Sequence, residues 1–322
     1  MQKAATLLKA DLEQVEQEFV ANLASDVPLI SKIGEYILSS GGKRVRPMLL
    51  LLAARISGYS GQAAAALAAV VEFIHTATLL HDDVVDDADL RRGNASANTL
   101  YGNEASVLVG DFLFAQSFSM MVRHGDLAIL KVLSRATTRL AEGEVQQLIS
   151  TCDLDIEEQH YMTVINNKTA VLIAAACQVG GILGGVPADQ EQALHDFGME
   201  LGVAFQFMDD ALDYIADQNE FGKERGHDLY EGKVTLPLIH ALRHCSAEER
   251  REIGRIVELD DLAAEDLQTV CQIIDRYEGI EHTRQRALEM VAAAKERLTL
   301  FPPSEAKEAL FELADYVVTR RK

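Results

Sequence analysis

The chain has 322 residues, of which 48% are hydrophobic and 25% charged, so it is long and apolar enough to form a sizeable globular core. Acidic residues outnumber basic ones by 50 to 30, and the formal net charge of −20 argues against sequence-independent binding to nucleic acid. The four cysteines form no CxxC pair, which argues against a disulfide framework or a zinc site and favours a reduced, cytoplasmic protein.

The spacing of apolar residues predicts helices along the whole chain. Leu8, Leu12 and Val15 recur at i, i+4 and i+7, the period of one helix face. Residues 48–186 contain no proline, so long helices are permitted there. Runs typical of strands are scarce, and no long linker of low complexity interrupts the pattern. We therefore expect an all-α fold of about ten helices, with residues 1–322 as a single domain.

The first candidate site along the chain is a basic loop. Residues 41–47 read Gly-Gly-Lys-Arg-Val-Arg-Pro and place Lys43, Arg44 and Arg46 just before an expected helix. Backbone N–H groups at a helix start favour anions, so the loop suits a phosphate group. Taken alone, each of these side chains is more simply an ordinary surface charge.

An acidic cluster follows at the end of the apolar stretch 73–80. Asp82 and Asp86 lie four positions apart and share one helix face, with Asp83 about 100° around the axis. Like charges stacked in this way are unfavourable unless a cation lies between them. The cluster therefore indicates a cation site, although a solvated acidic face would also account for one such cluster.

The segment from Thr169 to Ala188 has no charged residue and follows directly on Lys168. Its length is close to that of a membrane-spanning helix. However, it contains Gln178, two Gly-Gly pairs and Pro187, so we interpret it as a buried helix that ends at the glycine pairs.

The acidic pattern recurs as Asp209, Asp210 and Asp213, again after an apolar stretch, residues 201–208. Two matched clusters on amphipathic helices are poorly explained as solvated faces, and we expect the two helices to face one another across a cavity. General acid–base work by paired carboxylates is an alternative, but it explains three acids per cluster less well. Magnesium is the natural partner, because it prefers oxygen ligands and bridges to phosphate.

Basic residues alternate with the acidic clusters along the chain. Because a metal held by carboxylates needs an anionic substrate group, these cations suit two diphosphates, one bridged by metal and one bound by Arg and Lys alone. The cations concerned are Lys43, Arg46, Arg91, Arg92, Lys168, Lys223 and Lys233.

These motifs, taken in order, resemble the trans-isoprenyl diphosphate synthases, in particular the long-chain polyprenyl synthases that make octaprenyl diphosphate. The resemblance runs from about residue 30 to 240. The residues that carry it are Gly42-Lys43-Arg44-x-Arg46-Pro47, Asp82-Asp83-x-x-Asp86, Arg91-Arg92, Lys168-Thr169, Gln206-x-x-Asp209-Asp210-x-x-Asp213 and Gly232-Lys233-x-Thr235-Leu236-Pro237.

The resemblance implies a helical bundle around a deep central cavity, a homodimer, and two or three Mg²⁺ ions per site. It also implies head-to-tail condensation of isopentenyl diphosphate with an allylic diphosphate. The metal ligands would be Asp82, Asp83, Asp86, Asp209, Asp210 and Asp213. The allylic diphosphate site would comprise Arg91, Lys168, Thr169, Gln206, Lys223 and Lys233, and the isopentenyl diphosphate site Lys43, Arg46, His75 and Arg92.

Product length is expected to depend on the wall below the first aspartate cluster. Ala77 and Thr78 are small, and a bulky aromatic residue there would close the cavity early, as in short-chain members of the family. We expect Phe118 and Met121, on the next helix, to form the floor, although ordinary core packing explains them equally well. The expected product has about eight isoprene units and serves quinone synthesis, with farnesyl diphosphate as the primer.

Two other functions stay open at this point. One is a shorter-chain synthase that makes farnesyl or geranylgeranyl diphosphate. The other is a non-catalytic partner subunit of a heteromeric synthase, which should have lost some of the Asp or Arg residues that are all present here. We expect a cytoplasmic protein with no transmembrane segment, although transient membrane association during product release is compatible with the sequence.

Overall fold

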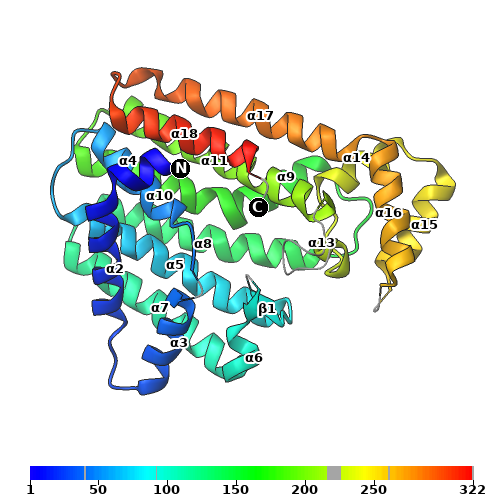
Figure 1. Ribbon diagram of the computed structural model, residues 1–322, viewed down its shortest axis with the longest axis horizontal. Helices are drawn as coiled ribbons and strands as arrows, with labels where there is room; N and C mark the ends of the chain where they lie inside the picture. The colour runs from blue at the N-terminus through cyan, green and yellow to red at the C-terminus, as the bar shows by residue number, and fades with distance from the viewer. Residues whose placement is uncertain (40, 92, 216–225, 260–261, 321–322) are drawn as a thin grey trace. The chain divides into compact units, whose positions relative to one another are not determined.

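The computed structural model describes residues 1–39, 41–91, 93–215, 226–259 and 262–320 (Figure 1). Nearly all of them are helical, which confirms the all-α prediction. Within these ranges the strands are β1 (Leu90–Arg91) and β2 (Asn94–Ala95), an antiparallel pair with Arg91 opposite Asn94. The described helices outnumber the ten expected, because several of them, such as α1, α6 and α13, are only four to six residues long.

The chain divides into two compact units, each made of three segments. Unit 1 comprises residues 1–138, 172–198 and 295–313, and unit 2 comprises residues 139–171, 199–294 and 314–322. The boundaries fall inside or between helices and at no linker. The expectation of a single domain over residues 1–322 stays a prediction.

Unit 1 contains the N-terminal helices and the first aspartate cluster. Its complete elements are α1 (Gln2–Leu7), α2 (Lys9–Leu23), α3 (Pro28–Ser39), α4 (Val45–Ile56), α5 (Ala63–Val85), β1, β2, α6 (Ala97–Tyr101), α7 (Asn103–His124) and η2 (Leu298–Leu300). It also holds most of α10 (Val171–Gly184) and parts of α8 (Leu127–Ile149), α11 (Ala188–Ile215), α17 (Gly279–Arg297) and α18 (Glu305–Thr319).

The core of unit 1 is built around α5, which packs most extensively on α7 and also on α2 and α4 (Figure 1). Phe19 of α2 stacks on Phe73 of α5 with ring centroids 4.2 Å apart, and both rings are buried. The alanine-rich first half of α5 suits this position, because alanine favours the helix and lets neighbouring helices approach closely. Packing from several directions fixes the end of α5, where the aspartates lie.

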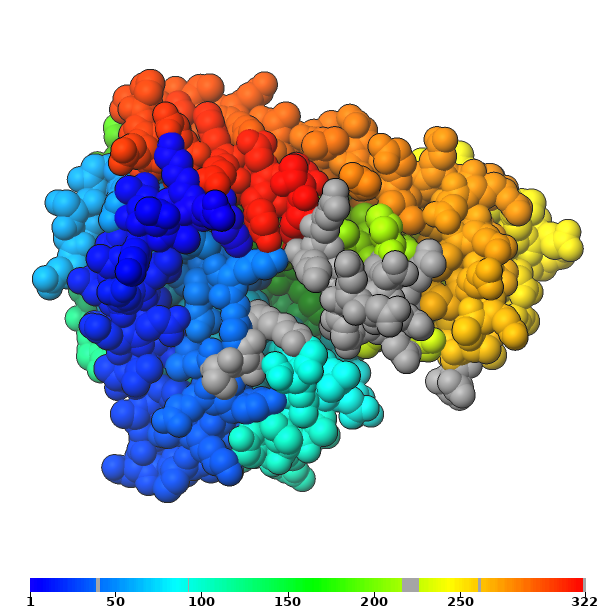
Figure 2. Space-filling view, in the orientation of Figure 1, coloured from blue at the N-terminus to red at the C-terminus, as the bar shows by residue number. Residues whose placement is uncertain are grey.

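The first residues of the chain lie against α18, as Figure 2 shows for the dark blue and red segments. The Met1 amino group lies 2.7 Å from Glu312, and Lys3 pairs with Glu308. Both contacts lie within unit 1. Exposed pairs of this kind contribute little stability individually, but together they hold the N-terminus on α18.

Unit 2 contains the second aspartate cluster. Its complete elements are α9 (Glu158–Ile165), the π-helical turn η1 (Asn166–Ala170), α13 (His227–Tyr230), α14 (Leu236–His244), α15 (Ala247–Val257) and α16 (Ala264–Arg276). It also includes the later part of α8, the part of α11 after Gly198, most of α17 and the end of α18.

Local sequence signals explain several helix ends in unit 2. Ser246 and Glu249 form a capping box at the start of α15, so each side chain accepts a hydrogen bond from the other residue's backbone N–H. Pro237 lies in the first turn of α14, where its missing N–H costs nothing. The expectation that the uncharged segment ends at its glycine pairs is confirmed, since α10 ends at Gly184.

Three stretches are long and apolar enough to cross a membrane by length and composition alone: α5, α7, and the continuous run Glu158–Gly184. Most side chains of α5 and of the run Glu158–Gly184 are buried within the protein, whereas α7 leaves a larger share of its surface exposed. The expectation of no transmembrane segment stays a prediction.

Candidate active site

The first aspartate cluster closes α5, and its members differ in their surroundings. Asp82 and Asp86 are half-buried, whereas Asp83 is only 3% exposed. Asp83 accepts hydrogen bonds from Nε and Nη2 of Arg91, at 2.6 and 2.5 Å. The middle aspartate therefore holds Arg91, the cation on the β1–β2 hairpin.

The basic loop, residues 41–47, contacts α5 at His75, seven residues before the first aspartate. Arg46 Nη1 lies 3.1 Å from His75 Nε2. A guanidinium group can only donate, so the His75 Nε2 atom accepts and the imidazole carries its hydrogen on Nδ1. Lys43 is exposed. The structure thus brings together two of the residues predicted for isopentenyl diphosphate, Arg46 and His75; Arg92 lies outside the described residues.

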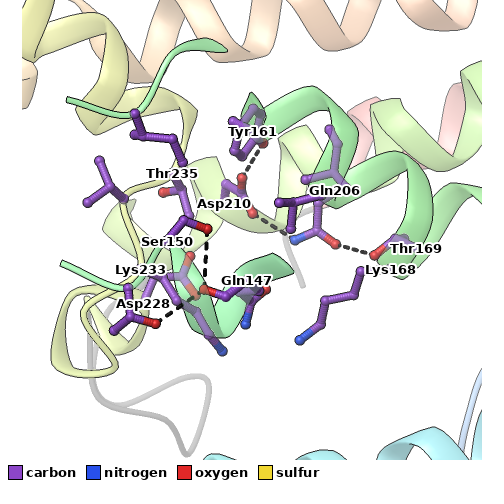
Figure 3. Close-up of a pocket in the computed structure, with 15 residues that line it drawn as sticks. Gln147, Ser150, Tyr161, Lys168, Thr169, Gln206, Asp210, Asp228, Lys233 and Thr235 are labelled. Carbon is purple, nitrogen blue, oxygen red and sulfur yellow. Dashed lines mark hydrogen bonds between the residues drawn. The ribbon is translucent and has the colours of Figure 1, made fainter. Parts of the chain in front are cut away.

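The second aspartate cluster is on α11 in unit 2 and is organised around its middle residue, Asp210. This side chain is 2% exposed and accepts hydrogen bonds from the Tyr161 hydroxyl and from Gln206 Nε2, the latter at 2.7 Å. Gln206 Oε1 in turn accepts from the Thr169 hydroxyl at 2.8 Å. Figure 3 shows this chain of hydrogen bonds along a pocket that Lys168 and Lys233 also line.

The outer members of the second cluster have different partners. Asp209 accepts from Arg320 Nη2 at 2.5 Å, near the C-terminus of the chain. Asp213 accepts from the backbone N–H groups of His227 and Asp228, each at 3.1 Å. Asp213 therefore fixes the start of α13 in addition to any role towards a ligand.

Lys168 and Thr169 lie in the π-helical turn η1, between α9 and α10. A π turn contains one residue more than an α turn and is common at functional sites. The backbone of α8 approaches closely at Gly143, where an added Cβ would lie 2.6 Å from the Lys168 backbone nitrogen. The Lys168 side chain reaches Glu144 at 2.8 Å.

Lys233 lies on the other side of the same pocket. Its backbone N–H donates to the Asp228 carbonyl at 2.7 Å, and its ammonium group pairs with Glu231. Lys223, which the resemblance places in the same binding site, lies outside the described residues. The structure thus brings together Lys168, Thr169, Gln206, Asp210 and Lys233 in one pocket.

Burial and repulsion between acids raise the pKa values of two aspartates that line this pocket, Asp210 and Asp228. Burial, together with the charge of Asp228, raises the pKa of Asp210 to about 8, even though Tyr161 and Gln206 stabilise its ionised form. Burial and the charge of Asp213 raise the pKa of Asp228 to about 7. A cation bound nearby would lower both pKa values, because it stabilises the ionised carboxylates and relieves their repulsion.

The donor set fits a magnesium-type ion. Among the described residues, no three His, Cys, Asp or Glu side chains converge closely enough to hold a metal by themselves. Mg²⁺ does not need such a cage, since it is usually bound by one or two carboxylates, water and substrate phosphates. In the first cluster, the outer pair Asp82 and Asp86 supplies two half-buried carboxylates from one helix face.

The residues expected to set product length lie on the packed pair α5 and α7. Ala77 and Met121 are almost completely buried, and Thr78 and Phe118 are half-buried. The Thr78 hydroxyl donates to the His75 carbonyl at 2.8 Å, which fixes its orientation on α5. Their role as wall and floor stays a prediction.

Sequence reasoning missed four residues that the structure places beside the predicted ones: Glu144, Tyr161, Asp228 and Arg320. Asp228 had a signal, because it precedes the Gly232-Lys233 motif by one helical turn. Tyr161, Glu144 and Arg320 come from parts of the sequence without a motif, and only the fold brings them to the clusters.

Comparisons with known proteins identify the family of the chain. The family model for polyprenyl synthetase matches residues 27–274. Octaprenyl diphosphate synthase from Escherichia coli (strain K12) is 47% identical over 320 residues, which cover 99% of this chain and 99% of that protein. The chain therefore belongs to the polyprenyl synthetase family, whose members are prenyltransferases.

Solved structures show the same fold over the full chain. A polyprenyl synthase from Caulobacter crescentus, complexed with calcium and isoprenyl diphosphate, has a TM-score of 0.96 and 40% identity and covers 100% of this chain and 98% of its own. A decaprenyl diphosphate synthase from Rhodobacter capsulatus has a TM-score of 0.95 and 43% identity, over 100% and 99%. The resemblance seen in the sequence is confirmed.

Proposed function

We propose that this prenyltransferase is a long-chain trans-polyprenyl diphosphate synthase. It adds isopentenyl diphosphate head to tail to an allylic primer, farnesyl diphosphate, and stops near octaprenyl diphosphate, a precursor of quinone side chains. The full-length similarity to an octaprenyl diphosphate synthase supports this assignment. The observation that carries it is the matched construction of the two clusters, each with a buried middle aspartate that binds residues predicted for the allylic site.

Two or three Mg²⁺ ions would be held by the outer aspartates of each cluster, Asp82 and Asp86 in the first and Asp209 and Asp213 in the second, together with diphosphate oxygens and water. When bound, they neutralise the charge that builds up on the diphosphate as its carbon–oxygen bond breaks. Calcium in the Caulobacter crescentus structure occurs together with an isoprenyl diphosphate, which supports the pairing of metal and diphosphate in this family.

The chain's own cations bind and orient the diphosphates. Arg91, fixed by Asp83, would bind the allylic diphosphate, as would Lys168 and Lys233, each of which pairs with a glutamate. Arg46 beside His75, with the exposed Lys43, forms the second anion site. Such preorganised cations stabilise a leaving group without reorganising during the reaction.

Thr169 and Gln206 line the pocket where positive charge develops on the allylic group. Because the Thr169 hydroxyl donates its hydrogen to Gln206, its oxygen lone pairs stay available towards a carbocation. The pocket's apolar members, among them Val164 and Ile165, keep water away from that charge. The isopentenyl double bond then forms the new carbon–carbon bond, and the proton lost from its C2 passes to the released diphosphate.

We also propose that two copies of the chain associate through α7. One face of α7 carries Leu108, Ala115 and Val122, which are all exposed and lie seven residues apart, about two helical turns; we call them the exposed stripe on α7. Large apolar side chains exposed on one helix face favour an interface. Size-exclusion chromatography with light scattering should give a dimer, and Leu108→Glu should shift it towards the monomer. We place this dimer in the cytoplasm, with membrane contact limited to product release.

The function is tested by the dependence of the reaction on both substrates and on metal. Purified protein should incorporate labelled isopentenyl diphosphate only when farnesyl diphosphate and Mg²⁺ are both present, and EDTA should abolish incorporation. Farnesyl diphosphate alone should give no cyclic hydrocarbon. A folded, dimeric protein that incorporates no label would instead indicate a non-catalytic partner subunit.

A further inference from the structure

Arg44 is the one cation of the basic loop, residues 41–47, for which the proposed reaction has no use. Its side chain is 18% exposed, and two glutamates from different helices engage it. Arg44 Nε donates to Glu16 on α2 at 2.8 Å, and Nη1 donates to Glu72 on α5 at 2.7 Å. Glu72 is itself buried, with its side chain 9% exposed.

The backbone of Arg44 is in an unusual conformation. It has φ 48° and ψ 36°, in the left-handed region, at the residue that precedes α4. A non-glycine residue in this region is strained and persists when its surroundings impose the conformation. The two carboxylates supply that constraint, since they fix the side chain of the strained residue at two of its three guanidinium nitrogens, Nε and Nη1.

The loop is thereby tied to α5 at two successive points. Arg44 binds Glu72, and Arg46 contacts His75, which lies three residues further along the same helix. Residues three apart share a helix face, so the two contacts are neighbours on one side of α5. The position of Arg46 against His75 therefore depends on the neighbouring pair of Arg44 and Glu72.

We propose that Arg44, Glu72 and Glu16 form a positioning clamp, which holds the basic loop so that Lys43 and Arg46 can bind isopentenyl diphosphate, while Arg44 itself does not touch the substrate. The inference rests on the proposed function, because it assigns a supporting role within the isopentenyl diphosphate site. It makes the three cations of the loop unequal: two bind substrate and one fixes the loop.

The electrostatics of the clamp agree with this division. Burial lowers the pKa of the Arg44 guanidinium, but the charges of Glu72 and Glu16 outweigh burial and raise it above its ordinary value. The single positive charge is thus already opposed by two carboxylates. A third anion would have to displace one of them, whereas Lys43 is exposed.

The decisive variant is Glu72→Gln, which removes one charge and keeps the shape of the side chain. If the clamp positions the loop, the KM for isopentenyl diphosphate should rise about tenfold, while the KM for farnesyl diphosphate stays within about twofold. Arg44→Lys, which loses the forked guanidinium, should give the same split. If Arg44 were instead a substrate ligand, Glu72→Gln would free it, and the KM for isopentenyl diphosphate would fall or stay unchanged. That result would overturn the proposal.

The chain offers a matched control in Asp11→Asn. Asp11 of α2 pairs with Arg55 at the other end of α4, at 2.5 Å, so this variant also removes a salt bridge between helices of unit 1 but lies away from the loop. It should leave both KM values unchanged. Equal effects of Asp11→Asn and Glu72→Gln on the KM for isopentenyl diphosphate would mean that general loosening, and no specific positioning, is responsible.

Because Glu72 is buried, its variant could fold poorly, and Glu16→Gln provides the second test. Glu16 is 46% exposed, so this variant should fold normally and raise the KM for isopentenyl diphosphate by about two- to threefold, in the same direction as Glu72→Gln. If the unaltered protein is active and the KM for isopentenyl diphosphate is unchanged in Glu72→Gln, Arg44→Lys and Glu16→Gln, the clamp is refuted and the proposed function stands. Inactive unaltered protein refutes the proposed function.

Discussion

At the scale of single residues, the middle aspartate of each cluster differs from its neighbours. Asp83 and Asp210 are buried, while the outer aspartates of both clusters are half-buried. Helical spacing predicts that Asp83 points away from Asp82 and Asp86. It could not predict that Arg91 binds Asp83, or that Tyr161 binds Asp210, because those partners depend on where other elements pack.

We predict that Asp83→Asn mainly lowers the stability of the fold, whereas Asp82→Asn mainly weakens Mg²⁺ binding. Loss of the charge-assisted bonds to Arg91 should reduce the free energy of unfolding by about 2 kcal/mol in urea denaturation. Asp82→Asn should leave that value nearly unchanged and raise the Mg²⁺ concentration for half-maximal activity about tenfold. Indistinguishable behaviour of the two variants would contradict the division of roles.

At the scale of elements, the π turn η1 is what places Lys168 and Thr169 at the pocket. Hydrophobic periodicity predicts a helix in this segment correctly. It could not predict the extra residue in the turn, because one π turn hardly changes a pattern with a period of 3.6. The two glycines that leave room for the turn, Gly143 and Gly202, lie on other helices, so no residue next to the turn indicates the contact.

Gly143→Ala should therefore displace the π turn. The added Cβ would lie 2.6 Å from the Lys168 backbone nitrogen and 2.9 Å from the Asn167 carbonyl carbon, so the backbone must shift. We expect kcat/KM for farnesyl diphosphate to fall about tenfold. Gly254→Ala is the control, since its nearest neighbour is the flexible end of Leu154 at 3.1 Å. Equal activity of both variants would contradict this role of Gly143.

A second prediction at this scale concerns three histidines where α14 meets α17. His240 stacks on His282 with ring centroids 4.0 Å apart and lies 4.5 Å from His244. Burial and the nearby His282 lower the pKa of His240 to about 4. Between pH 6.5 and 4 the unfolded state then binds more protons than the folded state, so this histidine costs stability as the pH falls.

We expect His240→Gln to reduce acid destabilisation. Between pH 7 and pH 5, the melting temperature of the unaltered protein should fall more than that of His240→Gln, by about 2–4 °C. At pH 7 the two proteins should differ little. If the melting temperatures of the two proteins change in parallel with pH in differential scanning fluorimetry, protonation of His240 does not contribute to acid destabilisation.

At the scale of the whole molecule, each compact unit carries one aspartate cluster, although the sequence predicts one domain. The family resemblance predicts the site residues of both units, and the structure brings five of those in unit 2 together in one pocket: Lys168, Thr169, Gln206, Asp210 and Lys233. Product length could be predicted only in outline, since it depends on side-chain packing between α5 and α7. The exposed stripe on α7 likewise depends on which face of the helix the fold buries.

Met121→Ala should lengthen the product by about one or two isoprene units. Met121 is buried on α7, the helix that packs most extensively on α5, and its truncation would move the floor further from the aspartates; one helical turn, about 5.4 Å, is close to one extended isoprene unit. Thr78→Phe should have the opposite effect and shorten the product. Chromatography of the dephosphorylated products measures both, and an unchanged length in Met121→Ala would remove this residue from the floor.

The most direct test of the central claim is the length of the product of the unaltered protein. It should be incubated with Mg²⁺, farnesyl diphosphate and labelled isopentenyl diphosphate, and its products dephosphorylated and sized by chromatography. The assignment predicts a ladder that ends near eight isoprene units. A stop at three or four units would keep the reaction and contradict the long-chain assignment, together with the open wall at Ala77 and Thr78.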